Sequence, residues 1–136
     1  AMWAQDKAFQ ENHCGDWYGV WQDYAFEKGD LGAGKERKQI SSYASASQDD
    51  GRPCMIRKII DGEGKVLDEV RSDFYPASMT SWFVGNCFTF AKRTGDTHLE
   101  LEVGVRHAQF RTRSAFTYER GSEGVWGLSK VSLGRE

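Results

Sequence analysis

The sequence predicts an all-β protein: a single up-and-down antiparallel β-barrel of eight or nine strands behind a short N-terminal helix. Three observations lead to this prediction. The 15 glycines fall mostly between short apolar runs and only two prolines occur, which is typical of strands joined by tight turns. The strand-like runs follow one another at short intervals, with no helical segment between them. Closing such a sheet into a barrel removes edges that would otherwise pair with other chains.

The length and charge of the chain limit the classes to which it can belong. At 136 residues it has room for one domain, and we expect a lead-in helix over 1–14 and the barrel over 15–136. The 18 basic and 20 acidic residues give a net charge of −2, which does not favour nucleic acid as a partner. No apolar run approaches the roughly 18 to 20 residues that cross a bilayer, so we expect no transmembrane segment. The start lacks a charged stretch followed by an apolar core, so we expect any targeting segment to have been removed.

The chain begins with a predicted helix and a predicted strand. Residues 3–13 contain good helix formers and neither glycine nor proline, so a short helix is expected to lie across one end of the barrel. A strand follows over 17–24, and its side chains alternate between two faces. One face carries Trp17, Gly19 and Trp21, and the other carries Tyr18, Val20 and Tyr24.

Several further strands are predicted in the middle of the chain. They are expected over 35–45, 55–60, 66–74, 81–84, 87–92 and 98–103. The first of them is polar, which indicates a face in water or a barrel lining that is not oily. The second and third flank a turn that contains glycine, and they predict a hairpin. The last alternates apolar and acidic residues and predicts a half-buried strand.

The final part of the chain carries the one basic cluster. After a turn near 107–109, strands are predicted over 110–118 and 125–133. Arg111 and Arg113 share one face of the first of these strands, and Arg106 lies shortly before it. If these arginines point inward, they are expected to pair with ligand carboxylates, because the guanidinium fork binds a carboxylate through two hydrogen bonds. On an outer face they would instead be solvated and balanced by neighbouring acids, namely Glu100, Glu102 and Glu119.

The aromatic residues allow two interpretations. They could line a pocket for a flat apolar ligand, or they could fill the interior of a small barrel. The set comprises Trp17, Trp21, Tyr24, Phe74, Trp82, Phe88, Phe90, Phe110, Phe116 and Tyr118. Both interpretations stay open at this point.

Catalysis and metal binding have no independent support in the sequence. Cys14, Cys54 and Cys87 are widely spaced and form no CxxC pair, so we expect them to be reduced and partly buried. His13 and Cys14 are adjacent, and neighbours on a strand point to opposite sides, which makes them a poor metal pair or catalytic dyad. No nucleophile, phosphate, zinc or calcium motif is present. We therefore predict no catalytic and no metal-binding residue.

The start of the first strand resembles that of the lipocalins and calycins, which begin with a short helix and a Gly-x-Trp strand, here Gly15-Asp16-Trp17. The resemblance implies that Trp17 stacks at the closed end on an arginine of a late strand, either Arg111 or Arg113. A closer resemblance is to a lipocalin-like family of uncharacterised proteins from cyanobacteria and plastids. It is carried by Asn12-His13-x-Gly15-x-Trp17-x-Gly19-x-Trp21-x-x-Tyr24, by Arg111-x-Arg113 followed by Tyr118, and by a final Arg135-Glu136. That family is similar to the S-type phycobiliprotein lyases.

The resemblance implies a non-enzymatic binder of a small hydrophobic or tetrapyrrole-like ligand, such as a bilin, a chlorophyll-type pigment or a fatty acid. Two alternatives stay open: an accessory or assembly subunit attached to a photosynthetic membrane complex, and a bilin lyase or chaperone that serves an antenna protein. The accessory role predicts that Trp3, Trp82 or Phe83 belongs to an exposed patch. The expected location is a plastid, in the stroma or at the thylakoid, or the cyanobacterial cytoplasm. The residues expected to bind the ligand are Trp21, Tyr24, Phe74, Trp82, Phe88, Phe90, Arg106, Arg111, Arg113 and Tyr118.

Overall fold

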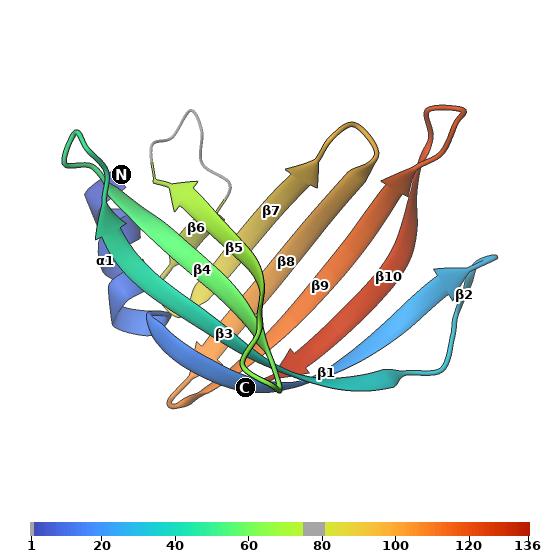
Figure 1. Cartoon of the computed structure of the whole chain (residues 1–136), viewed down its shortest axis with the longest axis horizontal. Coiled ribbons are helices and arrows are strands. Elements are labelled where there is room, and N and C mark those ends of the chain that lie inside the picture. The colour runs from blue at the N-terminus through green and yellow to red at the C-terminus, as the bar shows by residue number, and fades with distance from the viewer. Residues whose placement is uncertain (1, 75–80) are drawn as a thin grey trace.

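The computed structural model describes residues 2–74 and 81–136, which form one short helix and a strongly curved sheet (Figure 1). The elements are α1 (Met2–Asn12), β1 (Gly15–Glu27), β2 (Asp30–Leu31), β3 (Lys35–Ser47), β4 (Pro53–Asp61), β5 (Val66–Asp73), β6 (Ser81–Val84), β7 (Cys87–Thr94), β8 (His98–His107), β9 (Phe110–Arg120) and β10 (Trp126–Arg135). The all-β class and the short N-terminal helix are as the sequence predicts. Within the described residues, no helix combines the length and apolar character needed to span a membrane.

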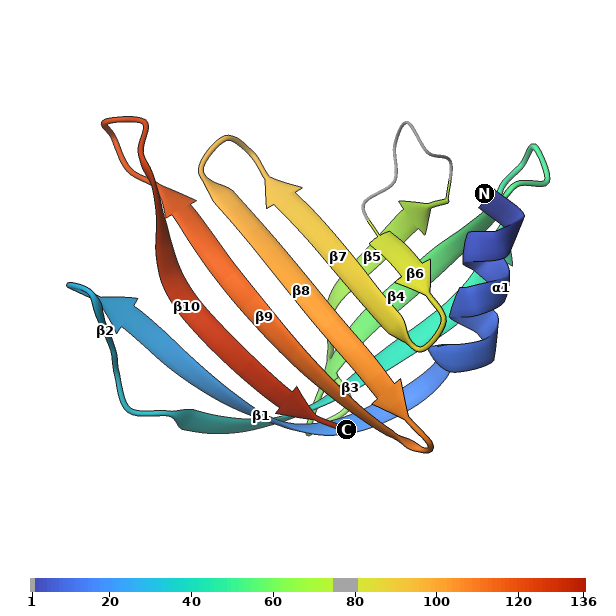
Figure 2. The ribbon, with the colours of Figure 1, turned by 180° about the vertical axis from the view of Figure 1, so that it is seen from behind.

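The strands form a nearly closed antiparallel barrel. Their order is β5-β4-β3-β1-β10-β9-β8-β7-β6, and β2 pairs only with β1. Strands that follow one another in sequence therefore pair in the sheet, except that β5 and β6 form its two ends, and β1 joins the two halves of the meander by pairing with β10 (Figures 1 and 2). Side chains bridge the two ends of the sheet. The Lys92 ammonium lies 2.7 Å from the Asp68 carboxylate, and the hydroxyls of Ser72 and Ser81 are 3.0 Å apart.

Two glycines let large rings lie flat on the inner wall. A Cβ on Gly134 would stand 2.5 Å from the Trp21 indole, and a Cβ on Gly104 would stand 2.0 Å from the Phe88 ring. Real Cβ atoms do not approach carbon atoms this closely. The small residues at these two positions therefore determine where the two rings lie.

One strand has its polarity reversed relative to an ordinary barrel. β8 is half buried, as its alternation predicts, but its acidic side faces the interior. Glu102 is buried, whereas Leu101, Val103 and Val105 are exposed on the outside. A buried carboxylate is costly unless it is paired. The reversal therefore requires cations inside the barrel.

An aromatic cluster fills the part of the barrel that α1 covers. The cluster consists of Phe9, Tyr43, Met55, Phe74, Phe83, Phe88 and Phe90. The helix is joined to it by Phe9, which is fully buried against three of these rings. Gln5 also exchanges two hydrogen bonds with the backbone of Phe83, from Nε2 to the carbonyl oxygen at 2.9 Å and from the Phe83 amide to Oε1 at 2.6 Å. The helix is thus part of the core and not only a lead-in segment.

Candidate ligand-binding site

Arg113 is buried inside the barrel and donates all of its hydrogen bonds to other residues of the protein. A guanidinium has five N–H groups. They donate to Glu136 Oε1 and Oε2 at 2.8 and 2.7 Å, to Glu102 Oε1 at 2.6 Å, to Ser41 Oγ at 2.6 Å and to Tyr43 Oη at 3.0 Å. Burial works against the charge of Arg113, but Tyr43, Glu102 and Glu136 together raise its pKa above the ordinary value. Arg113 therefore has no donor left for a ligand.

Arg111 is held by one carboxylate and three aromatic rings. Its Nε donates to Glu136 Oε1 at 2.7 Å. Its guanidinium carbon lies 4.5 Å from the centre of the Trp17 ring, 4.6 Å from that of Tyr43 and 5.5 Å from that of Phe88. The two terminal nitrogens are buried and find no acceptor among the described residues. The faces of the rings, which carry partial negative charge, take the place of acceptors here.

His13 is buried beside Arg111 and carries no charge at neutral pH. Its ring lies 5.4 Å from Phe83 and 4.9 Å from Phe88, measured between ring centres. Burial lowers the pKa of His13 to about 3, and the positive charge of Arg111 adds to the effect. Neither ring nitrogen has a hydrogen-bond partner in the described part of the chain. His13 therefore acts as an aromatic packing residue.

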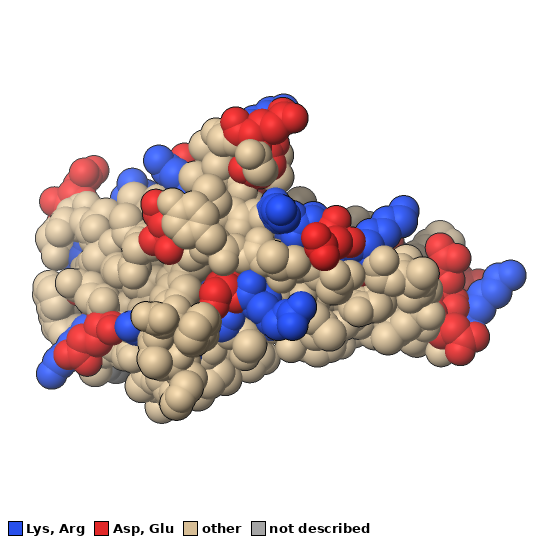
Figure 3. All heavy atoms as spheres, turned by 90° about the horizontal axis from the view of Figure 1, so that it is seen from below, with Lys and Arg blue, Asp and Glu red and all other residues tan. Residues whose placement is uncertain are grey.

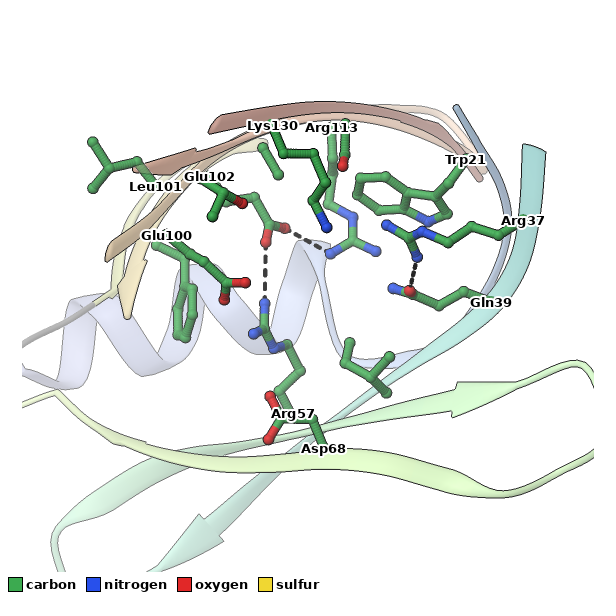
Figure 4. A pocket seen from close by; sticks show the side chains of 15 residues that line it. Trp21, Arg37, Gln39, Arg57, Asp68, Glu100, Leu101, Glu102, Arg113 and Lys130 are labelled. Carbon is green, nitrogen blue, oxygen red and sulfur yellow. Dashed lines mark hydrogen bonds and ion pairs between the residues drawn. The ribbon is translucent and has the colours of Figure 1, made fainter. Parts of the chain in front are cut away.

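Glu102 links Arg113 to Arg57 on the opposite wall (Figure 4). Its Oε1 accepts from Arg113, and its Oε2 accepts from Arg57 Nη1 at 3.1 Å. The Arg57 guanidinium also stacks on Phe90, with its carbon 4.1 Å from the ring centre. Burial raises the pKa of Glu102, but the charges of Arg113 and Arg57 outweigh burial and hold the pKa below its ordinary value. Glu102 is thus ionised, and its two cations balance the reversed polarity of β8.

A cavity of about 200 Å³ lies beside this ion-pair network and borders the aromatic cluster at Phe90, which belongs to both. Along β7, Phe88 and Phe90 belong to the cluster, whereas the next inward residue is Lys92. The charged side chains around the cavity are Arg37, Arg57, Asp68, Glu100, Glu102, Arg113 and Lys130. The rest of the lining is mixed and includes Ile59, Phe90, Ala115 and Thr117. The interior is therefore polar here, as the composition of residues 35–45 allows.

Trp21 forms one wall of the cavity, and other side chains fix it in place. The guanidinium carbons of Arg113 and Arg37 lie 4.5 and 4.8 Å from the centre of its ring. Arg37 Nε in turn donates to Asp23 Oδ2 at 2.5 Å, and Ser132 Oγ donates to Asp23 Oδ1 at 2.6 Å. Arg37 also donates to Gln39. These contacts hold Trp21 in position without any contribution from a ligand.

The structure separates the residues that the sequence suggested as one ligand set. Trp21, Phe90 and Arg113 line the cavity. Phe74 and Phe88 lie in the aromatic cluster, and Arg111 lies against Trp17, with Gly15 at the start of the same strand. Tyr24 and Tyr118 fall on the outward positions of β1 and β9, and Trp82 is exposed on the outside of β6. Arg106 caps α1, because its Nη1 donates to the carbonyl oxygens of Glu11 and Asn12 at 3.0 Å each.

Sequence reasoning missed most charged residues of the site. Arg37, Arg57, Asp68 and Lys130 were not considered as site residues, and Glu136 entered only as the end of the C-terminal motif. Glu100 and Glu102 were weighed only as partners on an outer face. Arg57 had a detectable signal, because a lone arginine shares a strand face with Met55 and Ile59. The three cysteines are free: Cys54 is buried, Cys14 is half-buried and Cys87 is exposed.

Comparisons with known proteins bear on the fold. No model of a known family and no curated protein matches the chain. A solved structure does match: a protein of unknown function from the DUF3598 family of Nostoc punctiforme PCC 73102, with a TM-score of 0.62 and 13% sequence identity. The match covers 93% of this chain and 48% of that chain, so this chain spans about half the length of the structure that it resembles. At this identity the likeness supports the barrel fold alone.

Proposed function

We propose that the protein is a non-enzymatic binder of a small organic molecule, held in the cavity beside the Glu102 network. The observation that carries this proposal is a hollow in the barrel whose polar lining is fixed in advance by ion pairs and stacked rings. Ligand sites are typically concave and largely preformed, with a few polar groups that fix the orientation of the ligand. The arrangement around Trp21 and Arg57 has these properties.

The size of the cavity favours a ligand smaller than a tetrapyrrole. Pockets for drug-sized molecules begin at roughly 300 Å³, and a cavity of about 150 Å³ holds one benzene ring. The cavity here measures about 200 Å³ and its lining is rich in charge. A bilin, a chlorophyll-type pigment or the chain of a fatty acid would need more space and a more apolar lining. We therefore narrow the binder proposal to a ligand smaller than a tetrapyrrole. The small volume also argues against the bilin lyase or chaperone alternative.

A fragment screen tests this function. Wild-type protein labelled with ¹⁵N would be mixed with neutral, cationic and anionic single-ring compounds, and the indole N–H signal of Trp21 would be followed. Trp82 is exposed on the outside and serves as an internal control. Ala115→Phe places a ring in the cavity, whereas Ser114→Phe places the same ring on the next, outward position of β9.

We expect some fragments to shift Trp21 and not Trp82, and we expect Ala115→Phe alone to abolish the effect. If no fragment shifts Trp21, or if Ala115→Phe binds as the wild type does, the cavity is not a ligand site.

The exterior supports a second candidate, the accessory or assembly subunit. Trp82 and Val84 on β6 and Val103 and Val105 on β8 are between 41% and 64% exposed. Trp3 on α1 is 63% exposed as well, whereas Phe83 is buried. β6 and β8 flank β7, whose Cys87 and Thr89 stand between the exposed residues of these two strands. Scattered apolar residues are normal on protein surfaces, but apolar residues that gather on one face are typical of interaction sites. Figure 3 shows the molecule from below, where residues other than Lys, Arg, Asp and Glu cover most of the face in view.

This second role is tested by the size of the assembly in the natural source. We expect a native gel of such an extract to show the protein with a larger complex, and Val103→Lys to release it. Glu63→Lys in an exposed turn is the control for the change in charge. Migration of the wild type at monomer size in the gel argues against the accessory role.

A further inference from the structure

We propose that the ligand of the cavity is a small carboxylate-bearing molecule and that Lys130 binds its charge. The inference rests on the ligand-binding function proposed above and adds the chemical class of the ligand. It is carried by a lysine of the lining that has no partner among the described residues, by a buried donor of Arg57 that finds no acceptor there, and by the size of the space.

The charged side chains around the cavity balance one another in number. Five cations and five carboxylates either line the cavity or pair with a residue that does. The cations are Arg37, Arg57, Lys92, Arg113 and Lys130. The carboxylates are Asp23, Asp68, Glu100, Glu102 and Glu136. Glu100 lies 3.4 Å from His98, and its side chain is 40% exposed. The charge of the ligand must therefore follow from the donors of the lining that are left unused.

Among the described residues, Lys130 is the cation of the lining that lacks a partner. Arg37 is paired with Asp23 at 2.5 Å, and Lys92 is paired with Asp68 at 2.7 Å. Lys130 lines the cavity at a position that is exposed to solvent, and it makes no hydrogen bond or ion pair with any described residue. Asp23 is within electrostatic reach of Lys130, but its two oxygens already accept from Arg37 and Ser132. The Lys130 ammonium is thus free to receive a ligand carboxylate.

Arg57 provides a second unused donor in the cavity wall. Its side chain is only 6% exposed, and its Nε–H has no acceptor in residues 2–74 and 81–136. A buried donor without an acceptor costs free energy, which an incoming acceptor recovers. Phe90, Ile59 and Ala115 supply apolar contacts in the same space. The lining therefore suits a molecule with one anionic group and a small apolar body.

The available volume suits a single ring that bears one carboxylate. A space of about 150 Å³ holds benzene, and benzoate is larger by one carboxylate group. At about 200 Å³ the cavity has room for this addition. Benzoate is therefore a suitable probe. Benzamide is its matched neutral control, because the two molecules have nearly the same shape.

The test is a titration of the whole protein with benzoate and with benzamide, followed through the indole signal of Trp21. We expect benzoate to bind at least about tenfold more tightly than benzamide, because hydrogen bonds to charged groups contribute more than neutral ones. Lys130→Gln should remove most of this preference, and Lys130→Arg should retain it. Lys58→Gln makes the same change of charge on the outward side of β4 and should leave binding unchanged.

The outcomes separate this inference from the function on which it rests. Equal binding of benzamide and benzoate, or unchanged benzoate binding by Lys130→Gln, would overturn the carboxylate assignment while the cavity remains a ligand site. If neither probe binds but neutral or cationic fragments shift Trp21, the ligand class is wrong and the binding function stands. If no fragment of any charge shifts Trp21, both proposals fail.

Discussion

The carboxylate of Glu136 accepts two hydrogen bonds from the guanidinium of Arg113, with 2.8 Å between Nε and Oε1 and 2.7 Å between Nη2 and Oε2. Both side chains are withdrawn from solvent. The arginine that the sequence offers to a ligand is therefore already bound by a carboxylate of the same chain. A ligand in the cavity therefore lies beside an ion-pair network that is already formed, and it does not supply the carboxylate partner of Arg113.

Glu136→Gln should destabilise the barrel strongly. The substitution leaves Arg111 and Arg113 without their shared counter-charge, and breaking a buried ion pair by removing one partner costs about 3–5 kcal/mol. Urea unfolding followed by circular dichroism measures the loss. Glu119→Gln, at a carboxylate that is 63% exposed, is the matched control and should change stability by about 0.5 kcal/mol or less. Equal effects of the two substitutions would contradict a structural role for Glu136.

Substitution on the acidic face of β8 should cost more stability than substitution on its apolar face, which is the reverse of the usual order. Leu101→Gln alters an outward side chain, so we expect a loss of about 0.5 kcal/mol or less. Glu102→Gln leaves two buried guanidinium groups under-compensated, and we expect a loss of about 3 kcal/mol. Chemical denaturation of both variants checks the difference. A more damaging substitution at Leu101 would show that the strand carries its acidic side outward.

Burial of neutral His13 should make the protein less stable in mild acid. Its pKa is lowered from 6.5 to about 3 on folding, so between these values the unfolded chain binds a proton that the folded chain does not. Stability from this residue is fully present above pH 6.5 and falls by up to about 1.4 kcal/mol per pH unit as the pH decreases towards 3. His13→Phe should flatten the dependence of the unfolding free energy on pH between 6.5 and 4. His107→Gln, at an exposed histidine, should leave the slope as it is. A slope unchanged by His13→Phe would rule out His13 as its source.

Gly134→Ala should displace Trp21 from the inner wall. The new methyl carbon would lie 2.5 Å from the indole, and overpacking of this kind typically costs about 1–3 kcal/mol. Gly127 lies on the same strand with nothing within 4 Å of the equivalent position, so Gly127→Ala is the control. Unfolding experiments and the near-ultraviolet circular dichroism of tryptophan measure both effects. Identical behaviour of the two variants would mean that the Trp21 ring does not lie on Gly134.

The sequence predicts the fold better than it predicts the site, for physical reasons that particular residues illustrate. Glycine-rich turns and alternation on β1 and β9 are local signals, and they group Trp17 with Trp21 and Arg111 with Arg113 on shared faces, but they leave open whether the arginine face turns inward. Which side of β8 faces inward depends on partners far away in the sequence. Glu102 is buried because Arg57 and Arg113 reach it from other strands. Local hydropathy contains no information about such pairs.

The structure also separates residues that the sequence analysis placed in one ligand set, because nearness in sequence does not put side chains on the same face. Tyr24 and Trp21 stand three residues apart, so they fall on opposite faces of β1. Arg106 is near the other arginines in sequence, but it caps α1. Lys130 carries no motif, and only the volume beside it makes it a candidate.

The pairing of β1 with β10 has a consequence for how the chain reaches its native state. Val20 pairs with Arg135, so one edge of the first strand waits for a partner from the far end of the sequence. Contacts between distant segments must overcome a large loss of chain entropy before they stabilise anything, and proteins dominated by them fold in milliseconds to seconds. During that interval β1 is an open template for strands of other molecules. The polar β3 on its other side can pair early, because it follows β1 closely in sequence. We therefore expect the hairpin of β1 and β3 to precede closure of the barrel, and aggregation of refolding chains to begin at the unpaired edge of β1.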